Sequence, residues 1–564
     1  MRILLLCHGF NSLTQRLHCD LRAAGHEVSV EFDINDAVSE EAVRLFEPDL
    51  ILAPFLKRAI PPSVFKAVPC FIVHPGPPGD RGPAALDWAI LEGATDWGVT
   101  VLEAVADLDA GPIWAFRCFP LRRASKSSLY RHEVMEGAVA AVFEALDRFR
   151  SGAAPASVPE AQSLWRGAVR QADRQIDWQR DTGEAILRKI RSADGMPGVR
   201  DTLFGEPVFL FDARPARGER PEGAEPGTVI ARSGPALAVR TVDGAVWIGH
   251  VRKADKASVK LPATHVFAGE CAGLPEISGG YRDILFEQAG DVGYLHFDFY
   301  NGAMDTCACL RLKAVFEEAA GSSARVLVLM GGPDHWSNGL NLNLIEAAGS
   351  PAEESWRNIQ AIDDLAETII RTTDKWVVSA LCGNAGAGGV FLARAADEVW
   401  IRPGTVLNPH YKDMGNLYGS EFWTYLLPKY AGADNAARIA DARLPMGAEE
   451  ALALGLADRV LGSDGLSFQS SVREAALRLG GEDLAPRLQE KARVRERDEA
   501  AKPLAAYRAA ELARMRKNFF GFDPSYHIAR YNFVRKVPKS RTPRTLARHR
   551  SGPPGGRSTR RAAS

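Results

Sequence analysis

The first 75 residues alternate short apolar segments with amphipathic ones, and this order constrains the fold more than any other feature of the chain. Apolar runs at residues 1–7, 27–32, 49–53 and 70–73 predict strands, with helical segments between them. Strands that alternate with helices indicate a parallel α/β sheet, whose ligands bind at the carboxyl ends of the strands. His74 directly follows the fourth run, so we expect it at the ligand-binding edge.

Charge and composition exclude several classes of function. The 69 Lys and Arg residues nearly balance 70 Asp and Glu, giving a net charge of -1, so we expect neither nucleic acid nor a membrane as a partner. No apolar window is long enough for a signal peptide or a transmembrane helix, which predicts a cytoplasmic protein. The eight cysteines are scattered, and Cys307-x-Cys309 lacks a second pair at zinc spacing, so we expect no metal site.

Changes in composition divide the chain into four parts. We predict a first α/β domain over residues 1–165 and a second over 281–535. Short alternating strands with Pro and Gly turns predict a small β-barrel domain, of the OB-like kind, over 166–268. Residues 538–564 are rich in Arg, Pro, Gly and Ser without apolar periodicity, so we predict a disordered basic tail.

The segment that follows His74 carries three further motifs. They are Arg81-Gly-Pro, Trp97-Gly-Val-Thr and Asp107-Leu-Asp-Ala-Gly. Here the chain resembles the folate-dependent formyltransferases, such as the methionyl-tRNA and glycinamide ribonucleotide enzymes. The resemblance implies a Rossmann-like domain that takes formyl from N10-formyltetrahydrofolate. In it, His74 would shuttle the proton of the attacking nucleophile and Asp109 would hold its charge and orientation.

The same resemblance implies the folate contacts and reveals one departure. The contacts fall on Asn11, Ser12, Gln15 and Arg81. The family's asparagine, two residues before the histidine, is Ile72 here, so a side-chain donor to the formyl carbonyl is missing. Either another group supplies this donor, or the nucleophile is reactive enough to need less help, as a thiolate would be compared with an amine near neutral pH.

The predicted barrel is similar to the carboxy-terminal barrel of the methionyl-tRNA formyltransferases, which accompanies tRNA binding there. In this chain the loop over residues 214–226 mixes Arg with Glu and forms no strong basic face. The barrel therefore gives no reason to expect nucleic acid as a partner.

A glycine-rich turn, Gly-Asn-Ala-Gly-Ala-Gly-Gly over residues 383–389, lies between an apolar run and a helix start. Such a turn either exposes N–H groups to an anion or only lets helix and strand pack closely. With segments at 293–304, 336–342 and 447–458, it resembles the crotonase or enoyl-CoA hydratase/isomerase superfamily. That resemblance implies a thioester site in which the N–H groups of Asn338 and Gly388 form an oxyanion hole.

The acids of a hydratase are missing from the matching positions. Phe391 stands where one glutamate is expected, and Gly404 or His410 where the second is, so water addition to a double bond is excluded. Polar and aromatic side chains crowd the stretch that follows Asn-Pro-His410. We predict Tyr411 and Glu421 as proton-handling groups with His410 behind them; the alternative is that this stretch is only core.

Two arginines near the end of the chain are candidates for CoA phosphates. Arg530 and Arg535 lie in an aromatic, basic segment, and guanidinium geometry suits phosphate. Ordinary surface arginines are the alternative.

A formyl-folate half joined to an acyl-CoA half resembles the hydrogenase maturation proteins of the HypX or HoxX type. This implies formyl transfer to CoA, then decarbonylation of formyl-CoA to carbon monoxide for a [NiFe]-hydrogenase. Folate and CoA are the expected partners, and other hydrogenase maturation proteins stay open as partners. The alternatives are a formyl-CoA hydrolase, a formyltransferase with another acceptor, and a non-catalytic one-carbon scaffold for hydrogenase assembly.

Overall fold

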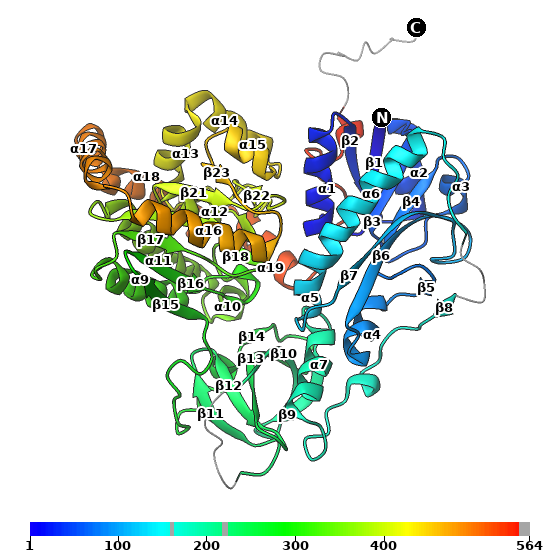
Figure 1. Ribbon diagram of the computed structural model, residues 1–564, viewed down its shortest axis with the longest axis horizontal. Coiled ribbons are helices and arrows are strands. Elements are labelled where there is room, and N and C mark those ends of the chain that lie inside the picture. Colours follow the sequence, from blue (N-terminus) through cyan, green and yellow to red (C-terminus); the bar gives the residue numbers. More distant parts are fainter. Residues whose placement is uncertain (158–162, 217–223, 552–564) are drawn as a thin grey trace.

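The computed structural model describes residues 1–157, 163–216 and 224–551. Figure 1 shows two large α/β units side by side, with a smaller β-rich unit below and between them. The first large unit precedes the small one in the chain, and the second large unit follows it. The predicted fold class, two α/β domains joined through a small β domain, is confirmed.

The first unit is built on a six-stranded sheet in the order β2-β1-β3-β4-β6-β7. Strands β1 to β4 pair in parallel, as the sequence pattern predicts, and β6 and β7 add in antiparallel fashion. Side chains of β1 alternate between two cores, with Ile3 and Leu5 in one and Leu4 and Leu6 in the other, because helices cover both faces. Its elements are β1 (Arg2–Cys7), α1 (Ser12–Ala23), β2 (Glu27–Phe32), α2 (Asp36–Phe46), β3 (Leu50–Phe55), α3 (Pro62–Phe65), β4 (Cys70–His74), β5 (Asp80–Arg81), α4 (Ala85–Glu92), β6 (Asp96–Glu103), β7 (Ile113–Pro120), α5 (Lys126–Leu129), a π-helical turn (Tyr130–Val134), α6 (Met135–Arg150) and β8 (Leu164–Trp165).

The small unit is an antiparallel sheet in the order β11-β12-β13-β10-β9, with β14 paired to β13. Its apolar side chains, such as Val208, Leu210 and Ile248, pack under the helix α7. Its elements are α7 (Gly183–Ala193), β9 (Val199–Leu203), β10 (Glu206–Pro215), β11 (Val229–Ser233), β12 (Ala236–Arg240), β13 (Ala245–Lys253), β14 (Leu261–Pro262) and α8 (Ala263–Val266).

The third unit has two sheets, β15-β16-β17-β19-β21-β23 and the short β18-β20-β22. Its strands are β15 (Ile284–Ala289), β16 (Val292–Phe297), β17 (Val326–Leu329), β18 (His335–Ser337), β19 (Trp376–Leu381), β20 (Asn384–Gly386), β21 (Glu398–Ile401), β22 (Leu407–Asn408) and β23 (Arg459–Val460). Its helices are α9 (Thr306–Ala320), α10 (Leu342–Ala347), α11 (Pro351–Arg371), α12 (Gly388–Arg394), α13 (Trp423–Ala431), α14 (Ala433–Ala442), α15 (Ala448–Ala453), α16 (Gly465–Gly480), α17 (Ala485–Ala501), α18 (Leu504–Phe520) and α19 (Ser525–Val534).

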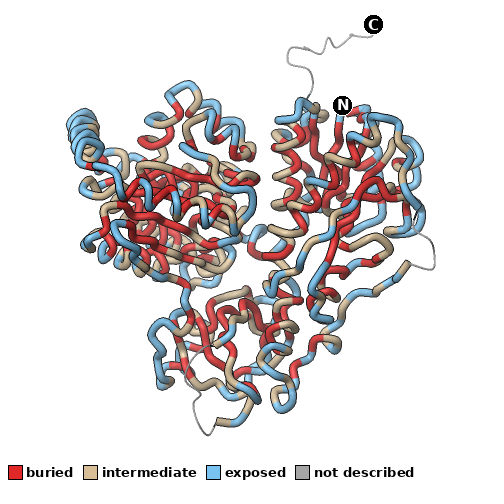
Figure 2. The backbone as a smooth tube through the Cα atoms, viewed as in Figure 1, coloured by how far each residue is buried: buried red, intermediate tan, exposed pale blue. Residues whose placement is uncertain are grey.

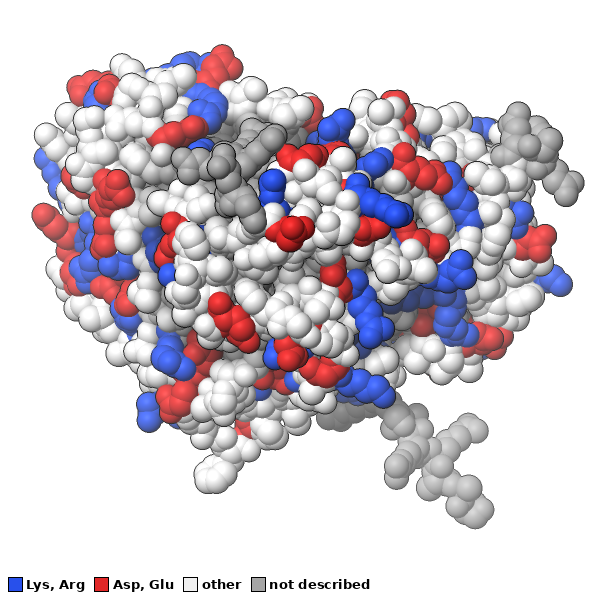
Figure 3. All heavy atoms as spheres, turned by 90° about the horizontal axis from the view of Figure 1, so that it is seen from below, with Lys and Arg blue, Asp and Glu red and all other residues white. Residues whose placement is uncertain are grey.

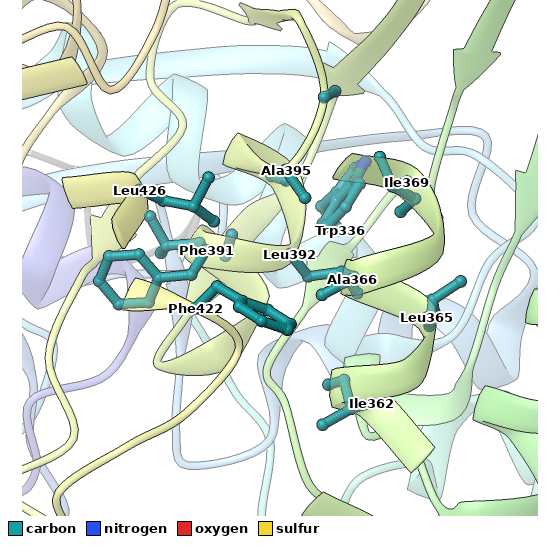
Figure 4. Packing of buried hydrophobic residues seen from close by; sticks show 14 of the residues in the cluster. Trp336, Ile362, Leu365, Ala366, Ile369, Phe391, Leu392, Ala395, Phe422 and Leu426 are labelled. Atoms are coloured by element: carbon teal, nitrogen blue, oxygen red, sulfur yellow. The ribbon is translucent and has the colours of Figure 1, made fainter. Parts of the chain in front are cut away.

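Each unit has its own buried interior, which Figure 2 shows as separate buried regions inside the three parts. The largest core belongs to the third unit. There the apolar face of α11, with Ile362 and Leu365, packs against α12 and against Trp336 (Figure 4). Phe391 and Phe422 lie side by side in this core, so the segment that bears Glu421 is anchored by its neighbour.

The predicted disordered tail is wrong for residues 538–551, while 552–564 lie outside the described residues. The segment returns to the first unit and covers the edge strand β2. Val30 N–H donates to the Leu546 carbonyl at 3.1 Å, and His549 and Arg550 pair with the buried Glu31 at 2.9 and 2.6 Å. Edge hydrogen bonds and one buried carboxylate order this segment, although it has no apolar periodicity.

Acidic and basic side chains are interspersed over the face shown in Figure 3, in line with the balanced composition. Within the part of the chain that the structure describes, no helix combines the length and the apolar character needed to cross a membrane.

Candidate functional site

One cavity of about 1810 Å³ lies where the three units meet. Its wall includes His74 and Asp109 from the first unit, Lys260 from the small unit, and Gly388 and Glu421 from the third. Residues that the sequence assigns to two different reactions therefore face one continuous space.

Polar contacts between the first and third units hold this cavity together. Arg402 donates to Glu136 at 2.7 Å, and Ser128 donates to Asp334 at 2.7 Å. The Asn408 side-chain amide donates to Gln15 Oε1 at 2.9 Å. These contacts cross between the units, so the two ends of the cavity are fixed relative to each other.

His74 ends β4 and is only 4% exposed. Its Nε2 lies 2.9 Å from Asp80 Oδ1, and its Nδ1 lies 3.7 Å from Asp109 Oδ2. We assign the proton to Nε2 from this hydrogen bond, which leaves Nδ1 as the basic nitrogen toward Asp109. A Cβ at Gly76 would lie 2.5 Å from Asp80 Oδ1 and 2.6 Å from His74 Nε2, so only glycine allows this close loop.

The loop backbone fixes the Asp109 carboxylate. Asp109 has a φ of 54°, and its Oδ2 accepts the Gly82 N–H at 3.1 Å. Asp80 was not among the predicted site residues, although it orients the histidine. Its signal in the sequence was a carboxylate in the Pro- and Gly-rich loop directly after His74.

Three of the four predicted folate contacts line the cavity. Asn11, Ser12 and Gln15 do so at the start of α1, where Asn11 caps the helix by accepting the Thr14 N–H at 3.0 Å. Arg81 instead donates to the Leu108 carbonyl at 3.0 Å, which braces the loop that carries Asp109. Ile72 also lines the cavity, so the wall is apolar where the formyltransferase asparagine would be.

The other end of the cavity is organised around Glu421, in the loop before α13. The Tyr411 hydroxyl donates to Glu421 Oε2 at 2.7 Å, and the Ser420 N–H reaches the same oxygen at 3.2 Å. Glu421 Oε1 receives no hydrogen bond from the described residues, and a Cβ at Gly388 would come within 2.0 Å of it. One carboxyl oxygen is thus held, and the other lies beside Gly388.

Burial shifts the pKa of the Glu421 carboxyl group upward. It raises the pKa of Glu421 to about 8, and the negative charge of nearby Asp363 acts in the same direction. The Tyr411 hydroxyl has a second acceptor, the Ser420 carbonyl at 3.0 Å. When Glu421 is protonated, Tyr411 can turn to Ser420, so no buried donor loses its partner.

The backbone at this point is strained. Glu421 and Phe422 have φ values of 58° and 59°, in the left-handed region that residues other than glycine rarely adopt. Each such residue costs about 1–3 kcal/mol, which the surrounding contacts must offset. Strain of this kind is concentrated at functional sites, and the role of Glu421 stays a prediction.

The two predicted oxyanion-hole donors differ in whether their N–H groups already have a hydrogen-bond partner. Gly388 begins α12, and its N–H donates to no other described residue. The Asn338 N–H instead donates to the Gly302 carbonyl at 2.7 Å, so it is not the free donor we predicted. The reason is local: the turn at Tyr300–Gly302, where Gly302 has a φ of 65°, closes onto β18.

Phe391 and His410 lie in different surroundings near the Tyr411–Glu421 pair: Phe391 lies in the core and His410 lines the cavity. Phe391 is buried and stacks on Tyr411 with the ring centroids 5.7 Å apart, so it supports the tyrosine from the core side. His410 lines the cavity, and burial lowers its pKa, which favours the neutral ring. No described residue hydrogen-bonds its Nδ1, so the structure brings Tyr411 and Glu421 together but leaves His410 apart from that pair.

Both predicted phosphate arginines pair with Glu346, but only one of them lines the cavity. Arg530 is buried and donates to Glu346 at 3.0 Å, so it is used in an internal ion pair rather than in the cavity wall. Arg535 does line the cavity. The wall near it also contains Arg252, Lys256 and Lys536, none of which forms an ion pair with a described residue, and sequence reasoning missed all three.

In the described ranges no group of three or more His, Cys, Asp or Glu side chains is placed to hold a metal ion.

Comparison with known proteins places each unit in a family. Residues 31–145 match the formyl transferase family, 168–266 match the formyl transferase C-terminal domain, and 300–521 match the enoyl-CoA hydratase/isomerase family. A methionyl-tRNA formyltransferase from Pelobacter propionicus is 30% identical over 41% of this chain and 71% of its own length.

Two proteins are similar over nearly the whole chain. The hydrogenase maturation factor HoxX of Bradyrhizobium diazoefficiens is 59% identical, over 98% of this chain and 97% of its own. The crystal structure of HypX from Aquifex aeolicus in complex with tetrahydrofolic acid is 46% identical, with a TM-score of 0.94 over 98% of this chain and 99% of that one. The similarity therefore extends across all three units.

Proposed function

Because the chain belongs to the HypX/HoxX family of hydrogenase maturation factors, we propose that it makes carbon monoxide from a formyl group in two steps. The first step transfers formyl from N10-formyltetrahydrofolate to the thiol of CoA, and the second releases CO from formyl-CoA. The CO would become a ligand of a [NiFe]-hydrogenase. The observation that carries this proposal is the one cavity, which has a histidine–carboxylate pair at one end and a buried tyrosine–glutamate pair at the other.

The first step suits the His74 end. His74 Nδ1 accepts the proton of the CoA thiol as the sulfur attacks the formyl carbon, and it returns that proton to the departing folate nitrogen. Asp80 fixes the ring through Nε2, and Asp109 stabilises the imidazolium that forms. The HypX crystal structure contains tetrahydrofolate, which supports a folate site in the matching unit here.

The wall residues fit CoA as the acceptor. Arg252, Lys256 and Lys536 have no carboxylate partner among the described residues, so they are free to bind phosphate groups. Because the cavity is continuous between its two ends, formyl-CoA can pass from His74 to Glu421 without release into water. Water would otherwise hydrolyse it to formate.

The second step suits the Glu421 end. Glu421 Oε1 takes the formyl proton, the electrons of the C–H bond become the lone pair of CO, and those of the C–S bond go to sulfur. The proton then passes from Glu421 to the thiolate, so formyl-CoA gives CO and CoA with no other reactant. The N–H of Gly388 holds the carbonyl oxygen, and Phe391 stands where a hydratase has a glutamate.

The proposal is tested by supplying the purified protein with N10-formyltetrahydrofolate and CoA and trapping CO with a reduced haem protein. We expect CO in proportion to the tetrahydrofolate formed, and a CoA requirement that is catalytic rather than stoichiometric. Formate as the product without CO would favour a formyl-CoA hydrolase and overturn the second step.

We expect Arg252→Ala to weaken CoA binding about tenfold, equivalent to about 1.4 kcal/mol, because one charge-assisted phosphate contact is lost. Titration calorimetry with CoA measures this, and the loss should shrink as salt is added. Arg493→Ala, which removes an exposed arginine of α17 with a side chain 72% exposed, is the control and should bind CoA normally. Equal affinity in both variants would place the phosphates elsewhere.

A further inference from the structure

Two further carboxyl groups lie directly behind the loop that carries Glu421. Asp363 comes from α11 and Glu511 from α18, and both are about 1% exposed or less. They reach the loop from distant parts of the chain. Neither lines the cavity, so neither touches a substrate.

Asp363 holds the loop at Glu421 itself. Its Oδ1 accepts the Glu421 N–H at 2.8 Å, and its Oδ2 accepts the Ser420 hydroxyl at 2.7 Å. Glu511 holds the next turn, since its Oε2 accepts the Phe422 N–H at 3.0 Å and its Oε1 accepts the Thr424 N–H at 2.8 Å. The two carboxyl groups therefore bind the N–H groups of both left-handed residues, Glu421 and Phe422, and that of Thr424 just beyond them.

We propose that Asp363 and Glu511 are positioning residues for Glu421, which fix its strained backbone so that the carboxyl group meets Tyr411 and Gly388. This inference rests on the proposed role of Glu421 in CO release. A backbone that is strained in this way needs such acceptors, because nothing in its own sequence favours the left-handed conformation. Backbone N–H groups bound to carboxylates are also stronger contacts than those bound to neutral acceptors.

The same arrangement makes the loop sensitive to protonation. Charged and titratable groups around Glu421 and its neighbour Asp363 come from four elements: Cys309 on α9, Asp363 and Asp364 on α11, Arg508 and Glu511 on α18, and Tyr411 on the loop. Arg508 is the one cation in this set. Burial raises the pKa of Asp363, of Glu421 and of Glu511, the last to about 8, so the three carboxyl groups do not all ionise together near neutral pH.

Substrate-free protein gives the first test. The folded state keeps protons on these carboxyl groups that the unfolded chain releases near pH 4–5, so the free energy of unfolding should fall as pH rises toward about 8. Asp363→Asn and Glu511→Gln should each make this fall less steep in urea unfolding curves measured from pH 5 to 8. Glu353→Gln, an exposed position on α11, should leave the slope as it is in the natural protein.

Activity gives the second test. CO release from supplied formyl-CoA should rise with pH as Glu421 ionises, and Asp363→Asn should move this rise to lower pH by about one unit, since a neighbouring negative charge is removed. Asp363→Ala also removes the acceptor of the Glu421 N–H, so it should lower kcat at least tenfold with little change in KM. Asp363→Asn keeps an acceptor at this position and should retain most of the natural kcat.

The outcomes separate this inference from the proposed function. If the natural protein makes no CO, the proposed function fails. The change of the free energy of unfolding with pH still decides whether the three carboxyl groups keep their protons in the folded state. If Asp363→Asn and Glu511→Gln leave both the slope and the pH profile unchanged, the positioning role is wrong. A loss of activity in Asp363→Asn without a shift in the profile would mean a purely structural role and would also overturn it.

Discussion

Glu421→Gln should abolish CO release while formyl transfer to CoA continues. Glutamine keeps the shape of the side chain and can still accept a hydrogen bond from Tyr411, but it cannot take the formyl proton. Loss of a general base typically costs 10²- to 10⁴-fold in rate, so we expect CO formation to fall by about three orders of magnitude. Tetrahydrofolate should still appear at the normal rate in the presence of CoA, with formyl-CoA accumulating until it hydrolyses to formate.

The folded state of this variant should be at least as stable as that of the natural protein above pH 7. Burial raises the pKa of Glu421 to about 8, so its ionisation costs stability at higher pH, and a neutral glutamine removes this cost. Normal circular dichroism and a normal midpoint in urea would thus show that the lost activity is chemical. CO release within tenfold of the natural rate would exclude Glu421 as the base.

Tyr411→Phe is the matched change at the partner residue. It removes the hydroxyl that donates to Glu421 Oε2 and keeps the ring that stacks on Phe391. We expect a smaller loss than for Glu421→Gln, about 10- to 100-fold, because the base remains but its orientation and proton exchange are impaired. The measurement is again CO release from supplied formyl-CoA.

The features that depend on local sequence could be predicted. Strands β1 to β4 follow from apolar runs between helical segments, and His74 follows from its place at the end of β4. Tyr411 and Glu421 could be selected because polar and aromatic side chains crowd a segment next to the glycine-rich turn. Each of these signals is contained in a short stretch of chain.

The features that depend on contacts between distant segments could not be predicted. Asp363 and Glu511 lie on helices, and their sequence context does not distinguish them from solvent-exposed acidic residues. The one usable signal was that Asp363 falls on the apolar face of α11, between Ile359 and Ala366. Arg530 looked like a phosphate ligand because its partner Glu346 is far away in the sequence. The shared cavity itself depends on how three units pack, and no motif within one unit encodes that.

His74→Asn should give the complementary result, a loss of formyl transfer with CO release intact. Asparagine has no basic nitrogen for the thiol proton and is too short to replace the Nε2 contact with Asp80, so tetrahydrofolate formation should fall about 10²- to 10⁴-fold. Supplied formyl-CoA should yield CO at the natural rate, because Glu421 and Tyr411 are untouched.

Mixing His74→Asn with Glu421→Gln then tests whether the shared cavity matters. Each protein can perform one step, so CO made by the mixture must come from formyl-CoA that leaves one molecule and enters another. Because the natural cavity joins both ends, the mixture should make CO far more slowly than the natural protein, and excess formyl-CoA hydrolase should suppress it. The natural protein should resist the same hydrolase. Equal sensitivity of both would mean that formyl-CoA is released between the steps, and the continuous cavity would then have no role in transfer.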